Sequence, residues 1–305
     1  MKQRINYFIK KDEGNIVLIT AFLFIGLLGM AGLVLDGGLV YMTKSHLQKV
    51  ANASALSGAQ ELFNGEAAVE EVVRQTLRYH NEEENMSNLD IDPEQKVTVD
   101  LTKNVPLTFG QLFGFDEVDV TAHAAAELRT MGRATGAAPL GIDESIPLEL
   151  YKKYKLKVDS TGVEYGNFGV LALGAPGAKT YEYNLRHGYD EELKVGDILE
   201  TETGNISGKT RSVIQERVNG CSDDPYHIQN RDCSRIILIP VYKPYNHTEN
   251  QLKQVEVKGF AYFYITDPMS TKDTSITGMF IKFAGTGFAE ENSVNRGAYT
   301  IRLTE

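Results

Sequence analysis

The stretch that decides the architecture of this chain is Ile16–Leu35, IVLITAFLFIGLLGMAGLVL, which is followed directly by Asp36, Gly37 and Gly38. It contains no charged residue, and its one polar side chain, Thr20, can hydrogen-bond to a helix's own backbone. At 1.5 Å per residue, a helix of this length spans roughly 30 Å, the hydrocarbon thickness of a bilayer. The sequence therefore predicts a membrane-spanning helix over residues 16–35.

The charges that flank this run predict its orientation. Four basic residues precede it: Lys2, Arg4, Lys10 and Lys11. Positive charge collects on the cytoplasmic side of membrane helices, so we expect residues 1–15 in the cytoplasm and nearly all later residues outside it. A cleaved secretory signal is the alternative, but its apolar core would be about 7–15 residues and a small-residue cleavage site would follow. This run is longer and lacks such a site, which favours a permanent anchor.

Composition limits the classes of function open to the chain. It has 305 residues and a net charge of −10, so the basic surface that binds nucleic acid is not expected. The two cysteines, Cys221 and Cys233, predict a disulfide, because that is the default outside the membrane. Closing a loop of about a dozen residues stabilises by roughly 3 kcal/mol in the chain-entropy model. No metal-ligand spacing is present, so neither a metal nor another cofactor is expected.

The helix is expected to continue past the membrane through residues 39–62, which contain no proline and many good helix formers. Small residues recur on its faces, where they let another helix approach closely. They are Ala51, Ala55 and Ala59 beyond the membrane, and Gly26, Gly29 and Gly32 within it. These residues pack either on the chain's own domain or against copies of the chain or its relatives.

The rest of the chain predicts an α+β fold. We expect a region of helices and strands over residues 36–131, with a second helix at 66–79 and half-buried strands near 97–101 and 118–122. Residues 132–141, GRATGAAPLG, are rich in glycine and alanine and predict a linker. Residues 142–305 contain several apolar segments separated by glycine-rich turns, which predicts a β-rich domain of the sandwich or barrel type.

The segment from Gly14 to Leu62 resembles the N-terminal region of TadG-like proteins. These belong to the tight-adherence (Flp pilus) assembly machinery, which is related to type IV pili. The resemblance rests on the apolar run, on the LDGGLVY step at residues 35–41, and on LQKVANASALSGA at residues 47–59. The following strand–turn–strand unit, with Pro106 and Phe109, also looks like the pseudopilin-like part of these proteins.

This resemblance implies a single-pass structural or assembly component of a Tad pilus or secretion apparatus. Its partners would be the bilayer and other pilus machinery proteins or copies of itself. The packing residues would be the glycines and alanines named above together with Asp36, Gly37 and Gly38. Prepilin peptidases cut after a glycine, which makes Gly14–Asn15 the candidate processing site. Here no acidic residue stands at the fifth position after that glycine, as it does in pilins.

The sequence carries no catalytic signature such as G-x-S-x-G, H-E-x-x-H or a phosphate-binding loop, so an enzyme is not expected. Its only histidine–carboxylate groupings are His187 with Asp190, and His227 with Asp223 and Asp224. Asp36 either marks the end of the membrane helix or pairs with a cation on a neighbouring subunit. The alternative function is a membrane-tethered cell-envelope or adhesion binding module without catalytic activity.

Overall fold

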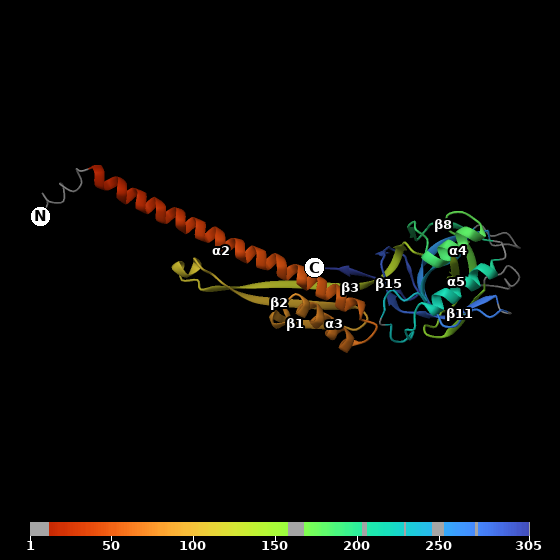
Figure 1. The fold of residues 1–305 in the computed structure, drawn as a ribbon. Helices are drawn as coiled ribbons and strands as arrows, with labels where there is room; N and C mark the ends of the chain where they lie inside the picture. Colours follow the sequence, from red (N-terminus) through yellow and green to blue (C-terminus); the bar gives the residue numbers. More distant parts are fainter. Residues whose placement is uncertain are drawn as a thin grey trace, which may run out of the picture.

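The molecule is elongated, with a long helix at one end and a globular domain at the other (Figure 1). The structure is a computed structural model of the chain, and it describes residues 12–157, 168–202, 206–228, 230–245, 253–271 and 274–304. Most of the expected cytoplasmic segment, residues 1–11, therefore lies outside the described residues. The α+β fold, with its apolar N-terminal helix and β-rich C-terminal region, is confirmed.

Helix α2 (Asp12–Gln60) is a single helix of 49 residues, so the apolar run and the following segment form one rod. Helix α3 (Glu66–Tyr79) packs back on its C-terminal half after a turn at Gly65, whose φ of 95° favours glycine. The two helices approach closely at Gly58, where an added Cβ would lie 2.6 Å from a methyl group of Val73. Gly58, which belongs to the LQKVANASALSGA segment of residues 47–59, thus lets α2 and α3 pack closely.

Three antiparallel strands cover one side of this helix pair: β1 (Met86–Asp92), β2 (Lys96–Pro106) and β3 (Glu117–Ala134). Alternate residues of β2 and β3 face α2, as the two-residue period requires. Val97 opposes Ala126 and Val99 opposes Ala124, and all four are fully buried. Short one-turn 3-10 helices lie before β1 (Glu83–Asn85) and at the β2–β3 tip (Gly110–Phe113).

The C-terminal half is built around a closed ring of five strands, β10–β8–β6–β4–β9, in which β9 pairs again with β10. Helices α4 (Ala178–His187) and α5 (Ser207–Asn219) bury their apolar side chains against one face of these strands. The ring strands are β4 (Leu140–Asp143), β6 (Phe168–Ala172), β8 (Ile198–Thr201), β9 (Ile236–Tyr245) and β10 (Gln254–Ile265). Strands β11 (Ser275–Ile281) and β5 (Lys153–Lys157) extend it from β10.

The chain returns to the first sheet at its C-terminus. Strand β15 (Ala298–Leu303) pairs antiparallel with β3 at residues 126–130, beside the β2–β3 ladder. Three short strands complete this region: β12 (Phe283–Ala284), which pairs with β15, and β13 (Phe288–Ala289) and β7 (Leu193–Lys194), which pair with β3. A fourth, β14 (Val294–Asn295), pairs with β10. We call α2, α3 and the sheet β1–β2–β3–β15 the stalk, and the ring with its helices the barrel domain.

Residues 132–141, expected to be a linker, differ from that expectation. Strand β3 continues to Ala134 and β4 begins at Leu140, and most of the segment is buried. Two of its three glycines allow close packing: a Cβ at Gly132 would meet Ser293 and Glu290, and one at Gly141 would meet the Tyr242 ring. The third, Gly136, has a left-handed φ of 81°. The expected domain of residues 142–305 is likewise not separate, since its last strand belongs to the stalk sheet.

Candidate functional site

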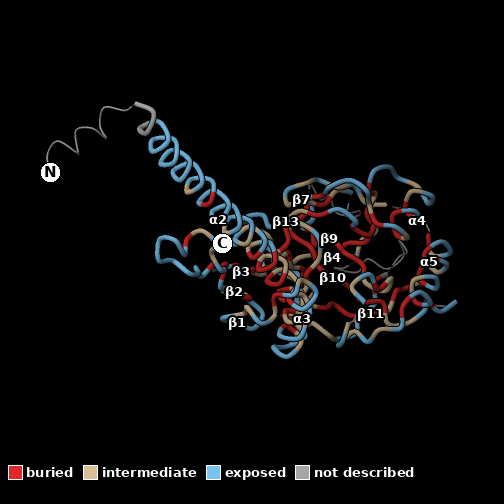
Figure 2. Tube along the Cα trace, turned by 60° about the vertical axis from the view of Figure 1, so that its left-hand side comes forward, coloured by how far each residue is buried: buried red, intermediate tan, exposed pale blue. Residues whose placement is uncertain are grey.

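The first half of α2 has almost no contact with the rest of the chain. Among residues 16–35, every residue is exposed except Gly29 and Gly32. Figure 2 shows this half as exposed, and buried residues become frequent only from Leu47 onward. Leu28 is 57% exposed, whereas Leu47 on the same helix is fully buried. The helix is long and apolar enough to cross a membrane, which supports single-pass anchoring.

At the end of the apolar run, Asp36 is held by the β2–β3 tip, although 72 residues or more separate them. Its carboxylate accepts three backbone N–H bonds: from Thr108 at 3.1 Å, Phe109 at 2.8 Å and Gly110 at 2.7 Å. Its side chain is only 7% exposed, so these bonds replace the water that a buried carboxylate would otherwise need. We call this arrangement the Asp36 clasp. Within the described chain, the hydrogen-bonding capacity of the Asp36 carboxylate is thus met by backbone amides of the hairpin tip.

Gly32, one turn before Asp36, completes the clasp. A Cβ at this position would lie 2.4 Å from atoms of the Phe109 ring, so only glycine lets that ring rest on the helix. Gly32 therefore packs against the protein's own hairpin.

The other small residues named from the sequence fall into two groups. Gly26, Gly29, Gly37 and Gly38 have nothing within 4 Å of a Cβ, so these positions are open to a neighbouring helix. Ala51, Ala55 and Ala59 are fully buried in the stalk core with α3 and the sheet. Of the two alternatives drawn from the sequence, the alanines follow the first: they pack on the chain's own domain.

The predicted disulfide is confirmed and lies near the joint between stalk and barrel domain. Cys221 and Cys233 are bonded, with Cα atoms 5.4 Å apart, and close a loop that contains Arg231. The Arg231 guanidinium donates to the carbonyl of Gln60, the last residue of α2, at 3.1 Å, and to the carbonyl of Ala284. Burial lowers the pKa of Arg231, and the charge of nearby Glu61 opposes that shift.

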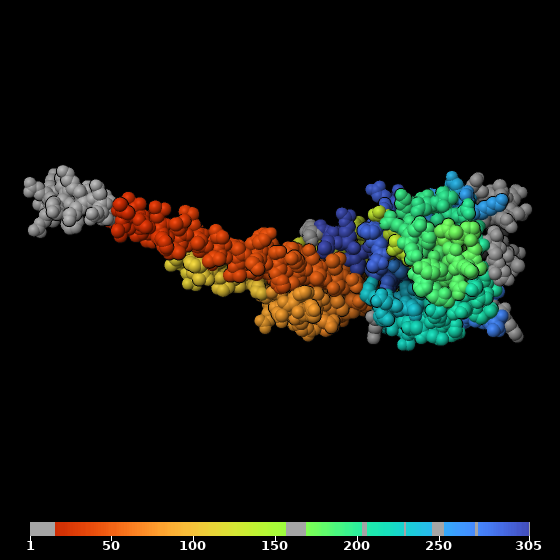
Figure 3. Space-filling model, turned by 45° about the horizontal axis from the view of Figure 1, so that its top comes forward, coloured from red at the N-terminus to blue at the C-terminus, as the bar shows by residue number. Residues whose placement is uncertain are grey.

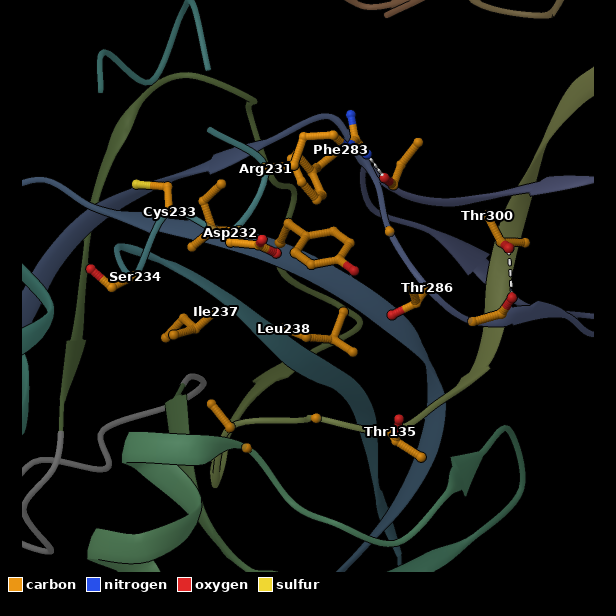
Figure 4. A pocket seen from close by; sticks show the side chains of 18 of the residues that line it. Thr135, Arg231, Asp232, Cys233, Ser234, Ile237, Leu238, Phe283, Thr286 and Thr300 are labelled. Atoms are coloured by element: carbon orange, nitrogen blue, oxygen red, sulfur yellow. Dashed lines mark hydrogen bonds between the residues drawn. The ribbon is translucent and has the colours of Figure 1, made fainter. Parts of the chain in front are cut away.

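A cavity of about 770 Å³ opens beside this joint. Figure 4 shows Arg231 next to Phe283 on one side, with Thr135 and Thr300 away from them. The Thr300 hydroxyl donates to the Gly287 carbonyl at 2.6 Å. Arg217 also lines the cavity, but its guanidinium donates to the carbonyls of Leu185, Arg186 and Ser234, and burial lowers its pKa to about 10. Both arginines of the cavity thus serve the fold.

The two histidine–carboxylate groupings do not form a catalytic arrangement in the described residues. Asp190 accepts a hydrogen bond from the Tyr183 hydroxyl at 3.2 Å, and the His187 ring packs on that tyrosine. Asp224 accepts from the backbone N–H of Tyr226, which orders a turn that includes His227. Among the residues that the structure describes, no group of three or more histidine, cysteine, aspartate or glutamate side chains could hold a metal ion.

Comparison with known families agrees with the architecture of the stalk. Residues 14–61 match the TadE/G-like Flp pilus-assembly family, and residues 40–126 match the Tad-like Flp pilus-assembly family. Over residues 14–126 the chain is therefore similar to TadE/G-like and Tad-like Flp pilus-assembly proteins. The matched part contains α2, α3, β1, β2 and much of β3, and it includes the Asp36 clasp. No curated protein and no solved structure matches the chain.

Three contributions to this region were not predicted from the sequence: the tip amides of residues 108–110, Arg231, and Glu82. The last is a buried carboxylate that meets Lys103 at 2.6 Å and His46 at 3.4 Å, joining β2 to α2. The tip amides carry no side-chain signal, because backbone N–H groups look alike in any sequence. Arg231 could have been suspected from its place inside the disulfide loop.

Proposed function

We propose that this TadE/G-like chain is a single-pass membrane component of a Tad (Flp) pilus or secretion apparatus, with its N-terminus in the cytoplasm. The observation that carries the proposal is the division of α2. One uninterrupted helix has a bare apolar half, suited to a bilayer, and a half built into a folded stalk. Such a rod holds the barrel domain at a fixed distance outside the membrane, where it contacts other machinery proteins.

The open glycines provide the surface for helix packing in the membrane. Gly26 and Gly29 leave the helix backbone exposed, and small residues favour close helix–helix approach in lipid. We therefore propose that neighbouring helices, from pilus machinery proteins or from copies of this chain, pack on this face. Gly37, eleven residues after Gly26 and thus about three turns along the helix, is also open and lies near the same face just beyond the apolar run. Gly38 is open as well but lies on another side of the helix.

The test is co-purification of the full chain from native membranes in mild detergent, with the bound proteins identified by mass spectrometry. We expect pilus-assembly proteins to be recovered, and the Gly26→Leu/Gly29→Leu double variant to recover less of them. The matched control is Leu28→Met, an exposed, volume-conserving change on the same helix. Recovery of an isolated monomer from both the wild type and the control would contradict the proposal.

The same preparation tests processing at Gly14–Asn15. A pilin-like subunit that leaves the bilayer would begin at Asn15, but the fifth residue of that chain would be Ile19 rather than a carboxylate. We propose a permanent anchor, which predicts the intact mass of the full-length chain. The mass of a chain that begins at Asn15 would contradict the permanent anchor and would indicate a processed pilus subunit.

A further inference from the structure

The tip of the β2–β3 hairpin, residues 107–116, carries large apolar side chains that the described chain does not bury. Leu112 is 77% exposed, Phe113 is 58% exposed and Phe115 is 66% exposed. Soluble proteins rarely group such residues on a projecting turn unless the group meets a partner or a membrane.

This tip is an ordered turn. The N–H of Phe115 donates to the Gly110 carbonyl at 3.1 Å, and the N–H of Leu107 donates to the Asp116 carbonyl at 2.9 Å. Gly114 adopts a left-handed φ of 86°, which closes the turn between Phe113 and Phe115. The apolar side chains are therefore held in place by the backbone.

The Asp36 clasp sets the position of the tip along α2. The clasp attaches the tip at the residue directly after the apolar run, and Phe109 rests on Gly32 within that run. Gly32 lies three residues before Leu35, about 5 Å along the helix axis. Figure 3 shows the hairpin tip, in yellow, lying along the helix below its free N-terminal part. The tip is thus level with the end of the proposed membrane span.

Charge changes sharply at the same level. Residues 104–122 contain no lysine or arginine, and the carboxylates of Asp116, Glu117 and Asp119 follow directly after Phe115. An apolar turn followed by acidic residues fits a boundary between lipid and water. The absence of cations in this segment means that attraction to anionic lipid headgroups is not what holds it there.

We propose that the hairpin tip is a second membrane contact, in which Leu112, Phe113 and Phe115 enter the outer interface of the bilayer that α2 spans. Apolar side chains at such an interface reach about 5–10 Å into the boundary between headgroups and acyl chains. With the helix and the tip both in the bilayer and joined by Asp36, the stalk has a fixed tilt relative to the membrane. This inference rests on the membrane span of the proposed function.

The chain contains no tryptophan, so a single introduced tryptophan is an unambiguous probe. The full-length Phe113→Trp variant is placed in lipid nanodiscs with one chain per disc, with and without lipids brominated on their acyl chains. The Phe22→Trp variant reports on the span, and Tyr183→Trp, on the exposed surface of α4, reports on water. Leu112→Trp repeats the tip measurement at a second position.

We expect brominated lipids to quench Phe22→Trp and both tip variants, and to leave Tyr183→Trp unchanged. The tip variants should respond most to bromines near the headgroups and should be insensitive to the fraction of anionic lipid. Adding Asp36→Asn to Phe113→Trp should reduce its quenching, because the neutral amide has only one acceptor oxygen for the three N–H groups.

Two results would overturn the inference while leaving the span intact. In the first, Phe22→Trp is quenched but both tip variants behave like Tyr183→Trp. In the second, the tip is shielded without quenching and only when several chains share a disc, which assigns the tip to a protein partner. A lack of quenching at Phe22→Trp would instead remove the membrane span itself, and with it the basis of the proposed function.

Discussion

The two halves of helix α2 share one backbone rod and many of the same residue types, yet they have opposite environments. The half before Asp36 exposes nearly every side chain, whereas the half from Leu47 onward buries leucine, valine and alanine in the stalk. The difference shows which part of α2 packs against other elements of the same chain. From Leu47 onward, α3 and the sheet cover one side of the helix. Before the clasp the described chain leaves the helix almost bare, so that a bilayer or other helices have to cover it.

The largest effect is expected from charge in the bare half. Leu23→Arg/Leu27→Arg places two arginines near the middle of the span, at a combined insertion cost of about 6 kcal/mol on the translocon scale. We expect the chain to move from the carbonate-resistant membrane fraction to the soluble fraction. The control, Tyr41→Arg/Met42→Arg, adds the same charge at exposed positions beyond the clasp and should stay in the membrane. If both variants partition equally between the membrane and soluble fractions, the claim that only the first half of α2 lies in the membrane is contradicted.

The same substitution at two leucines tests the contrast in folding. Leu47→Ala removes a fully buried side chain and should lower the free energy of unfolding by about 2–5 kcal/mol. Leu28→Ala removes an exposed one and should leave stalk unfolding unchanged. Chemical denaturation in detergent, followed by circular dichroism, measures both. Similar losses for the two variants would mean that the bare half is covered by the chain itself.

The joint at the covered end of α2 depends on the disulfide. Cys221→Ser opens a loop with a sequence separation of 12 and should destabilise the barrel domain by roughly 3 kcal/mol. Since Arg231 lies within that loop and holds the Gln60 carbonyl, proteolysis at the joint should also become faster. Lys152→Ser, an exposed change in the same domain, is the control for a general effect of substitution. Unchanged proteolysis would show that Arg231 is positioned without the disulfide.

The smallest effect is expected at the glycines, and it is local. Gly32→Ala forces the Phe109 ring away from the helix, which should cost about 1 kcal/mol of folding free energy. Alanine also has a higher helix propensity than glycine by a similar amount, so the overall stability should change little. Hydrogen exchange at the amides of residues 108–110 should therefore accelerate while the unfolding midpoint barely moves. Gly29→Ala has open space and should leave these amides as they are. Equal exchange in the two variants would argue against the clasp.

The sequence predicted the parts of the fold that local pattern controls. The expected helix over residues 66–79 matches α3, and the alternation of Val97, Val99 and Leu101 lies in β2. The disulfide followed from having only two cysteines. The Asp36 clasp could not be predicted, because its partners are amides more than 70 residues away. The glycines of residues 132–141 predicted a linker for a related reason. Glycine is favoured in flexible segments, but also where packing is close, as at Gly132 and Gly141, and only tertiary contacts distinguish the two cases.

The most direct test of the central claim uses cysteine accessibility in intact membranes. The native cysteines are joined, so an introduced cysteine is the one reactive thiol among the residues that the structure describes. Leu28 and Tyr41 are both exposed in the structure, at 57% and 75%, and lie on either side of the clasp. With a membrane-impermeant maleimide, the account predicts rapid labelling of Tyr41→Cys from outside and no labelling of Leu28→Cys. Equal labelling of the two variants would contradict it, because the bare half of α2 would then be in water.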